Sequence, residues 1–303
     1  MKMMLFVALL VLNQSSQVTN HLIINGNGET LAEVDRSEFM FPIQVYPLFN
    51  KNKLTELEDK LDRQISRNPV NASINDQWKI IPEQPGVMLN RRSFTEQFYN
   101  YFYSNGQASI EIPTKTVYPR VDSELISEIR TDMIGYYATY YNRRNKERSN
   151  NIELASSAIN NHVVFPGEIF SFNQVVGNRT KAKGYLPAPV IVKGELSEGI
   201  GGGICQVSST LYNAAYGSGL KIEQRYSHSK RVPYVPPGRD ATVSWYGPDF
   251  TFRNKYNQPI LIRAHARNGV MITMIFSSDA INYTPREVPR MSGELPKEAP
   301  APL

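Results

Sequence analysis

The stretch Gly201-Gly202-Gly203-Ile204-Cys205-Gln206-Val207-Ser208-Ser209-Thr210-Leu211-Tyr212-Asn213-Ala214-Ala215 contains the only cysteine of the chain. Three glycines precede a segment with an apolar stripe, which predicts a helix with Cys205 in its first turn. In that position the unpaired backbone N–H groups and the helix dipole favour a thiolate over a thiol. The stretch therefore indicates a cysteine-bearing helix and makes Cys205 a candidate nucleophile.

Two later residues have the side chains that a nucleophilic cysteine requires. His228 follows Cys205 by 23 residues, and Asp240 follows His228 by 12. A histidine can accept the thiol proton, and a carboxylate can orient the imidazole. Each residue also has a structural interpretation. A free cysteine is often buried, a histidine between serines can bond a neighbour, and an acid after Pro-Pro-Gly-Arg is common in turns.

Other residues near Cys205 are candidates for binding the substrate or its oxyanion. Acyl transfer needs hydrogen-bond donors that stabilise the negative oxygen of the tetrahedral intermediate. We expect such donors from the glycine run, the start of the helix and the segment that contains Asp240. The candidates are Gly202, Gly203, Gln206, Ser208, Ser209 and Arg239.

The composition is that of a folded protein without an evident cofactor. The chain has 303 residues, of which 41% are hydrophobic and 20% charged, so it can form one large core or two ordinary ones. Its net charge of +5 suits an anionic surface such as a cell-wall polymer. One cysteine excludes an intramolecular disulfide, and no Cys/His spacing suggests zinc. No Lys-Ser/Thr pair follows the glycines, which argues against a phosphate-binding loop. We expect no cofactor, no metal and no nucleic-acid partner.

The amino terminus predicts the compartment. Lys2 precedes ten apolar residues, 3–12, and a polar stretch follows. This pattern is typical of a signal peptide, here residues 1–17, because a membrane-spanning helix needs about 20 apolar residues. If the segment is not cleaved, it would anchor the protein to the membrane. We therefore expect a secreted, wall-associated or membrane-associated protein outside the cytoplasm.

Hydrophobic periodicity predicts an α+β protein of two domains. Residues 25–118 form a small mixed domain with helices over 54–66 and 90–103 and with short strands that include 72–74 and 78–82. Residues 123–280 form a larger domain in which the cysteine-bearing helix packs on a mainly antiparallel sheet. There we expect helices over 123–141 and 152–161, and strands over 222–226, 241–246, 250–252, 260–266 and 270–276. The proline-rich tail, 284–303, should be flexible.

Several motifs of the second domain resemble the VanW family. They are Phe165-Pro166-Gly167-Glu168-Ile169-Phe170-Ser171-Phe172-Asn173, Gly184-Tyr185, the 201–212 block, His228-Ser229 and the stretch from Pro236 to Val243. The likeness covers about residues 150–280. Residues 55–118 look like the peptidoglycan-binding domain that often precedes it in Gram-positive envelope proteins. The resemblance implies a wall-associated protein of a family named after a vancomycin-resistance accessory gene, with no established activity.

Two functional hypotheses follow. In the first, Cys205 is the nucleophile, His228 the base and Asp240 the orienting acid of an enzyme that transfers acyl groups of peptidoglycan peptides. In the second, the protein is a non-catalytic peptidoglycan-binding or scaffold protein of the cell envelope, and Cys205 is structural. The sequence does not predict an oligomeric state.

Overall fold

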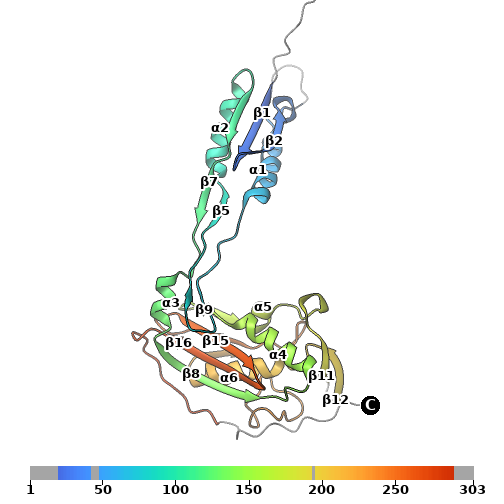
Figure 1. The fold of residues 1–303 in the computed structure, drawn as a ribbon, viewed down its shortest axis with the longest axis vertical. Coiled ribbons are helices and arrows are strands. Elements are labelled where there is room, and N and C mark those ends of the chain that lie inside the picture. The colour runs from blue at the N-terminus through green and yellow to red at the C-terminus, as the bar shows by residue number, and fades with distance from the viewer. Residues whose placement is uncertain (1–19, 42–47, 193–194, 290–303) are drawn as a thin grey trace, which may run out of the picture. The chain divides into compact units, whose positions relative to one another are not determined.

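The computed structural model describes residues 20–41, 48–192 and 195–289 (Figure 1). They divide into two compact units. The first runs to Val70 and continues over Gln84–Arg120, and the second contains Asn71–Glu83 and the chain from Val121 onward. Helices and mixed sheets occur in both, which confirms the predicted α+β class. The signal peptide expected over residues 1–17 lies outside the described residues.

The first unit packs two helices against small sheets. Strand β1 pairs antiparallel with β2 and parallel with β6, and β5 pairs antiparallel with β7. Asn50 and Asn90 cap the two helices through their side chains, as asparagine commonly does at a helix start. The elements are β1 (His21–Gly26), β2 (Glu29–Asp35), the 3-10 helix η1 (Arg36–Phe39), α1 (Lys51–Ile65), β5 (Gly86–Leu89), α2 (Arg91–Tyr103), β6 (Ala108–Glu111) and β7 (Thr114–Val117).

The core of the first unit is rich in phenylalanine. Phe94 and Phe98 of α2 are fully buried, as is Leu61 of α1. The ring of Phe39 meets Phe98 edge-on with centroids 4.7 Å apart. Such edge-to-face pairs add to the stability gained from burial. The two helices predicted over 54–66 and 90–103 are thus present with nearly the expected bounds.

The second unit is built on a four-stranded antiparallel sheet of order β8-β16-β15-β9. Helices α4 and α6 pack on one face of this sheet, and the short helix α3 packs on the other. The elements of these layers are α3 (Ser123–Ile129), β8 (Asp132–Tyr140), α4 (Lys146–Ile159), β9 (His162–Val164), α6 (Ile204–Gly217), β15 (Ile260–Arg267) and β16 (Val270–Ser277).

Alternation along the strands supplies both faces of this sheet. Ile260 and Ile262 of β15 belong to the large core beneath α4 and α6, whereas Leu261 between them faces the cluster around α3. Side chains of a strand alternate between its faces, so one apolar run can serve two cores. The predicted strands over 260–266 and 270–276 are therefore the central strands of the unit.

Smaller elements surround this sheet. A second sheet of order β10-β14-β13 combines one strand that precedes α6 in the sequence with two that follow it. Strands β11 and β12 pair with each other before α6, and β3 pairs with β4. The smaller elements are β3 (Ser73–Ile74), β4 (Ile80–Ile81), β10 (Ile169–Ser171), α5 (Phe172–Val176), the 3-10 helix η2 (Lys181–Lys183), β11 (Pro187–Val192), β12 (Glu195–Ile200), β13 (Lys221–Gln224) and β14 (Thr251–Arg253).

Two predicted elements are wrong. The helix expected over 123–141 ends at Ile129, and Asp132–Tyr140 is the strand β8. Aromatic and β-branched residues favour a strand here, and Gly135 lets the strand approach α6 closely. The strand expected over 241–246 is also absent, because this stretch runs irregularly against α6 and bonds to its serine side chains.

Residues 71–83 belong to the second unit, although the sequence placed them in the first domain. Arg263 of β15 is fully buried and donates to the carbonyl oxygens of Ile74 at 2.6 Å and Asn75 at 3.2 Å. Asn161 donates to the Ile74 carbonyl and accepts from its N–H at 3.1 and 3.0 Å. These polar contacts hold residues 71–83 on the sheet. They could not be predicted from the segment itself, because Asn161 and Arg263 lie far away in the sequence.

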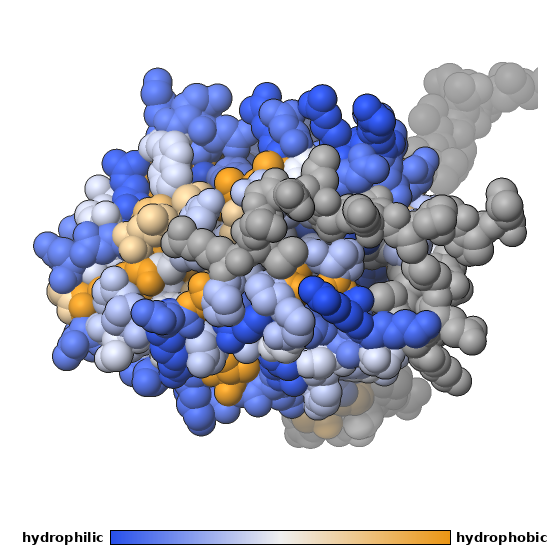
Figure 2. Space-filling model, turned by 90° about the horizontal axis from the view of Figure 1, so that it is seen from below, coloured by the Kyte–Doolittle hydropathy of each residue, from blue (hydrophilic) through white to orange (hydrophobic). Residues whose placement is uncertain are grey.

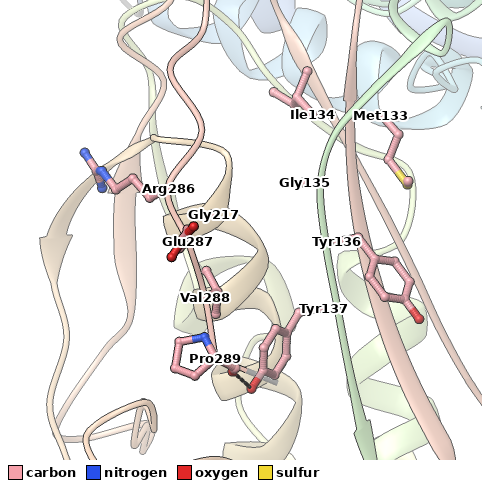
Figure 3. Close-up of a pocket in the computed structure, with 10 residues that line it drawn as sticks. All are labelled: Met133, Ile134, Gly135, Tyr136, Tyr137, Gly217, Arg286, Glu287, Val288 and Pro289. Carbon is pink, nitrogen blue, oxygen red and sulfur yellow. Dashed lines mark hydrogen bonds between the residues drawn. The ribbon is translucent and has the colours of Figure 1, made fainter. Parts of the chain in front are cut away.

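The beginning of the proline-rich tail is packed rather than free. The Arg286 N–H donates to the Gly217 carbonyl at 2.9 Å, and the Tyr137 hydroxyl donates to the Pro289 carbonyl at 2.9 Å. Figure 3 shows Arg286 to Pro289 running beside α6 and β8 and lining a pocket with them. The expected flexibility thus does not hold for residues 284–289, and residues 290–303 lie outside the described part.

One face of the molecule is mainly polar. Figure 2 shows hydrophobic residues there as small separate spots among hydrophilic ones. Within the described residues, no helix has the length and apolar character needed to cross a membrane.

The close approach of β8 to α6 is testable with Gly135→Ala. A methyl group on Gly135 would lie 2.0 Å from the Ser218 Oγ and 2.7 Å from the Ala214 carbonyl oxygen, so the strand must move away from the helix. Overpacking of this kind costs roughly 1–3 kcal/mol. We expect a loss of that size in the free energy of unfolding measured with urea. Ser157→Ala, on the exposed side of α4, is the control and should leave it nearly unchanged. Equal stability of the two variants would contradict the packing.

Candidate active site

Three glycines place Cys205 in the first turn of α6. Gly201 and Gly203 have φ values of +89° and +106°, which side chains with a Cβ rarely adopt. A Cβ on Gly202 would lie 2.6 Å from the carbonyl oxygens of Ala188 and Pro189. The turn is held by Asn151 of α4, whose amide donates to the Gly202 carbonyl at 3.0 Å. The glycine run is therefore a tight turn with a fixed shape.

His228 is fixed by Asp240. The Asp240 Oδ2 accepts hydrogen bonds from the His228 Nδ1 at 2.7 Å and from the His228 backbone N–H at 2.6 Å. The two side chains are only 6% and 9% exposed. A carboxylate at Nδ1 selects the tautomer that carries its proton there, which leaves Nε2 for another partner. The Cys205 thiol lies close enough to this imidazole that each group shifts the pKa of the other.

The charges of this trio shift its pKa values in opposite directions. Burial raises the pKa of the Cys205 thiol, but the hydrogen bond and the charge of His228 outweigh burial and bring the pKa below its ordinary value. Burial lowers the pKa of His228, but its bonds to Cys205 and Asp240 outweigh burial and bring the pKa above its ordinary value. Both shifts favour a thiolate beside an imidazolium, which is the reactive form of a nucleophilic cysteine.

The thiol makes two further contacts on the stretch that follows Asp240. The Cys205 Sγ lies 3.5 Å from the Val243 carbonyl oxygen and 3.8 Å from the Thr242 Oγ1. The Thr242 N–H in turn donates to the Tyr226 carbonyl at 2.8 Å, so this stretch lies beside the one leading to His228. Cys205 is half-buried, so the sulfur lies at the edge of the core rather than within it.

Four of the expected substrate or oxyanion residues instead hold the site together. The Ser208 Oγ donates to the Ala241 carbonyl at 2.6 Å, and the Ser209 Oγ accepts from the Ala241 N–H at 2.9 Å. The Gln206 side chain is engaged by Arg148 at 2.8 Å and by β8. The Arg239 Nε donates to Asn213 at 2.8 Å. The Ile204 and Gln206 N–H groups also donate internally, to the Gly201 and Gly203 carbonyl oxygens at 3.2 and 3.0 Å. The backbone N–H groups of Gly202, Gly203 and Cys205 are therefore the donors that we expect to face an oxyanion.

Sequence reasoning missed several residues of this site. Asn213 donates to the Arg239 carbonyl at 2.8 Å, and Tyr234 is buried close to the charges of Cys205 and Asp240. Arg179 is also close enough to Cys205 for their charges to interact. One signal was available, since Ser209 and Asn213 are polar residues one turn apart on the same helix. In the described part of the chain, no group of three or more His, Cys, Asp or Glu residues is arranged to hold a metal.

The comparisons with known proteins identify the family of the chain. Residues 147–276, which include Cys205, His228 and Asp240, match the model of a family described as VanW like protein. An uncharacterised protein from Bacillus subtilis strain 168, YoaR, is 53% identical over 294 residues and covers 97% of both chains. The chain belongs to the VanW-like family. The resemblance of residues 150–280 to the VanW family is thereby confirmed, whereas the likeness of residues 55–118 to a peptidoglycan-binding domain stays a prediction.

A second member of this family has a name that refers to drug resistance. The vancomycin B-type resistance protein VanW of Enterococcus faecalis V583 is 33% identical over 109 residues, which is 34% of this chain and 40% of that protein. No solved structure matches this chain. The match to the VanW-like family model lies entirely within the second unit, which contains Cys205, His228 and Asp240.

The effect of His228 on the thiol predicts a pH-dependent reactivity. Iodoacetamide reacts with the thiolate, so its rate with native Cys205 should rise at a lower pH than with the unfolded chain. In His228→Ala, burial remains but the two leading effects that lower the thiol pKa are lost, so the pKa should rise. At pH 7 the alkylation rate should then fall roughly tenfold for each unit by which the thiol pKa rises above 7.

The matched control is His21→Ala, which removes a histidine of the first unit. The reaction is followed by the mass of the intact protein between pH 4 and 10. An alkylation profile that is the same for wild type and both variants would show that His228 does not activate the thiol. Native Cys205 that reacts only after unfolding would show a structural thiol.

Proposed function

We propose that this VanW-like protein is an exported, cell-wall-associated cysteine enzyme that transfers acyl groups of peptidoglycan peptides by hydrolysis or transpeptidation. The observation that carries the proposal is the buried hydrogen bond of 2.7 Å between His228 Nδ1 and Asp240 Oδ2, with the Cys205 thiol close enough to the same imidazole for each to shift the pKa of the other. A carboxylate, a histidine that it orients and a thiol near that histidine are the three members of a cysteine-nucleophile triad.

In the first step, the Cys205 Sγ attacks the carbonyl carbon of a substrate amide and forms a tetrahedral intermediate. Backbone N–H groups at the start of α6 supply hydrogen bonds to its oxyanion. The His228 imidazolium then gives its proton to the leaving nitrogen, the C–N bond breaks, and a thioester remains on Cys205. The Asp240 carboxylate keeps the imidazole oriented throughout and stabilises its positive charge.

In the second step, His228 takes a proton from water or from an acceptor amine, which attacks the thioester. The S–C bond breaks and the acyl group leaves as a carboxylic acid or as a new amide. His228 and Cys205 return to their starting charge states. Water as acceptor gives hydrolysis, and an amine gives transpeptidation, so one site accounts for both reactions.

Three observations support a cell-wall substrate. The Enterococcus relative is named a vancomycin resistance protein, and peptides of the wall are amide substrates. The net charge of +5 favours contact with anionic wall polymers. The exposed rings of Tyr226, Trp245 and Tyr246 lie on the two stretches beside Cys205, where aromatic faces can bind a sugar or a peptide.

Trapping the thioester tests the reaction. The folded protein is mixed with muropeptides, quenched in acid and weighed by mass spectrometry. We expect an adduct whose mass equals the substrate minus its leaving amine on the wild type and none on Cys205→Ala. Loss of His228 as acid and base should slow product release in His228→Ala by about 10²–10⁴-fold. His21→Ala should behave as wild type.

The alternative function predicts a different result. If wild type and Cys205→Ala bind isolated cell walls equally and neither forms an adduct nor releases product, the protein is a binding or scaffold protein. An activated thiol without any adduct would instead contradict the choice of substrate. The alkylation profile and the muropeptide reaction thus test the nucleophile and the substrate separately.

A further inference from the structure

Arg179 follows α5 and lies against the residues that shape the cysteine site. Its Nη2 donates to the Asn173 Oδ1 at 2.7 Å, and its guanidinium lies over the ring of Phe172 at 5.8 Å. The same Asn173 donates through Nδ2 to the Ser244 carbonyl at 2.9 Å. Ser244 follows Val243, whose carbonyl contacts the Cys205 Sγ. One amide side chain therefore joins Arg179 to the stretch that contacts the thiol.

The stem of Arg179 lies on the other approach to Cys205. A Cβ built on Gly201, four residues before the cysteine, would be 3.4 Å from the Arg179 Cβ. Arg179 thus touches the glycine turn with its stem and connects to the Val243 stretch through its head. The charges of Arg179 and Cys205 are close enough to interact, which agrees with this placement.

The guanidinium has an unused donor. Its Nη1 is buried and has no hydrogen-bond partner among the described residues, and no carboxylate of those residues lies within ion-pair distance. Asp249, the acid whose charge acts on Arg179, already accepts from the Ser171 hydroxyl and from the N–H groups of Asn173 and Phe250. A buried donor without a partner is costly, and a guanidinium matches a carboxylate with two parallel hydrogen bonds.

Another arginine near the site does not have this character. Arg239 also has one buried nitrogen without a partner, but its guanidinium lies 5.0 and 4.4 Å from the rings of Tyr212 and Tyr216 and donates to Asn213. Arg239 is therefore fixed against α6 by two rings and an amide. Arg179 differs in its contact with the glycine turn and in its charge interaction with the thiol.

We infer that Arg179 binds a carboxylate of the substrate beside Cys205, so that the site prefers peptides with a carboxylate close to the bond that is cleaved. The inference rests on the proposed function and specifies its substrate class. The carboxylate is either the free carboxyl end of the peptide or an acidic side chain next to the scissile amide. Arg179 is a substrate-binding residue in this account, and it takes no part in the proton transfers.

Two alkylating reagents of similar size test the inference without any turnover. Iodoacetate and iodoacetamide both form a bond from the Cys205 Sγ to their CH₂ carbon and release iodide, but only iodoacetate has a carboxylate. We expect Arg179→Gln to lower the rate ratio of iodoacetate to iodoacetamide on the order of tenfold, because a hydrogen-bonded charge pair is lost. Arg179→Lys keeps the charge but not the fork of donors, so its rate ratio should lie between those of the wild type and Arg179→Gln.

The control is Arg253→Gln, which removes an arginine paired with Glu223 at 2.8 Å. Its rate ratio should equal that of the wild type. Rates are compared at a pH where the thiol is fully ionised, so that an effect of Arg179 on the thiol pKa does not enter. His228 attracts iodoacetate in every variant and therefore cancels from the comparison.

The outcomes separate the two claims. A fast iodoacetamide reaction with an unchanged ratio in Arg179→Gln would overturn the role of Arg179 and leave the nucleophile intact. At pH 7, where the unfolded thiol is mostly protonated, an iodoacetamide rate no faster than that of the unfolded chain would overturn the proposed function itself.

A measurement on the wild type is available if Arg179→Gln does not fold. Acetylated dipeptides with a free carboxyl end should protect Cys205 from iodoacetamide better than their amidated forms. If the acidic side chain is the group bound, peptides with Glu should protect better than those with Gln whatever their carboxyl end. The four peptides contain Glu or Gln, each with a free or an amidated carboxyl end. Equal protection of Cys205 by all four would contradict the inference.

Discussion

The hydrogen bond between the His228 imidazole and the Asp240 carboxylate is the interaction on which the rest of the site depends. A carboxylate that is 9% exposed is costly without partners, and here both of its donors come from His228. The bond joins two irregular stretches of chain, and it fixes the imidazole close enough to Cys205 for their charges to interact. The surroundings of the Cys205 thiol therefore depend on the hydrogen bonds between His228 and Asp240, in which the thiol takes no part.

Helix α6 provides the surface on which these stretches lie. An irregular buried backbone needs partners for its N–H and C=O groups, because it has no neighbouring strand to supply them. Ser208, Ser209 and Asn213 provide those partners, since they bond to the backbone of Arg239 and Ala241. This explains why a helix in the middle of a core has polar residues on one side. The glycine turn positions Cys205, and the contacts of Ser208 and Ser209 with Ala241 position the neighbouring Asp240.

The sequence predicted the members of the site better than their surroundings. Cys205, His228 and Asp240 have distinctive side chains, and the glycine run indicates where the helix begins. The roles of Ser208, Ser209, Gln206 and Arg239 depend on which backbone group each one meets, and that is decided by tertiary packing. Arg179 could not be recognised from the sequence, because its proposed role depends on a buried donor, Nη1, that has no hydrogen-bond partner in the folded structure.

The fold shows the same division. Long periodic segments such as α1, α2, β15 and β16 were predicted, because their apolar spacing reflects the face that they bury. The strand β8 was mistaken for a helix, since its alternation is interrupted at Gly135, where contact with α6 excludes a side chain. Residues 71–83 were placed in the wrong unit because their attachment depends on the distant Arg263. In each case the missing information is a partner far away in the sequence.

Cys205 and His228 carry opposite charges in the proposed reactive state, as a thiolate and an imidazolium. NMR titration of the His228 ring in the wild type and in Cys205→Ser tests it most directly. The account predicts that the pKa of His228 falls when the thiolate is removed, because Cys205 is the leading group that raises it. The imidazolium would then be lost at a lower pH in the variant. An unchanged titration of His228 would contradict the account, since the histidine would then have no electrostatic link to the cysteine.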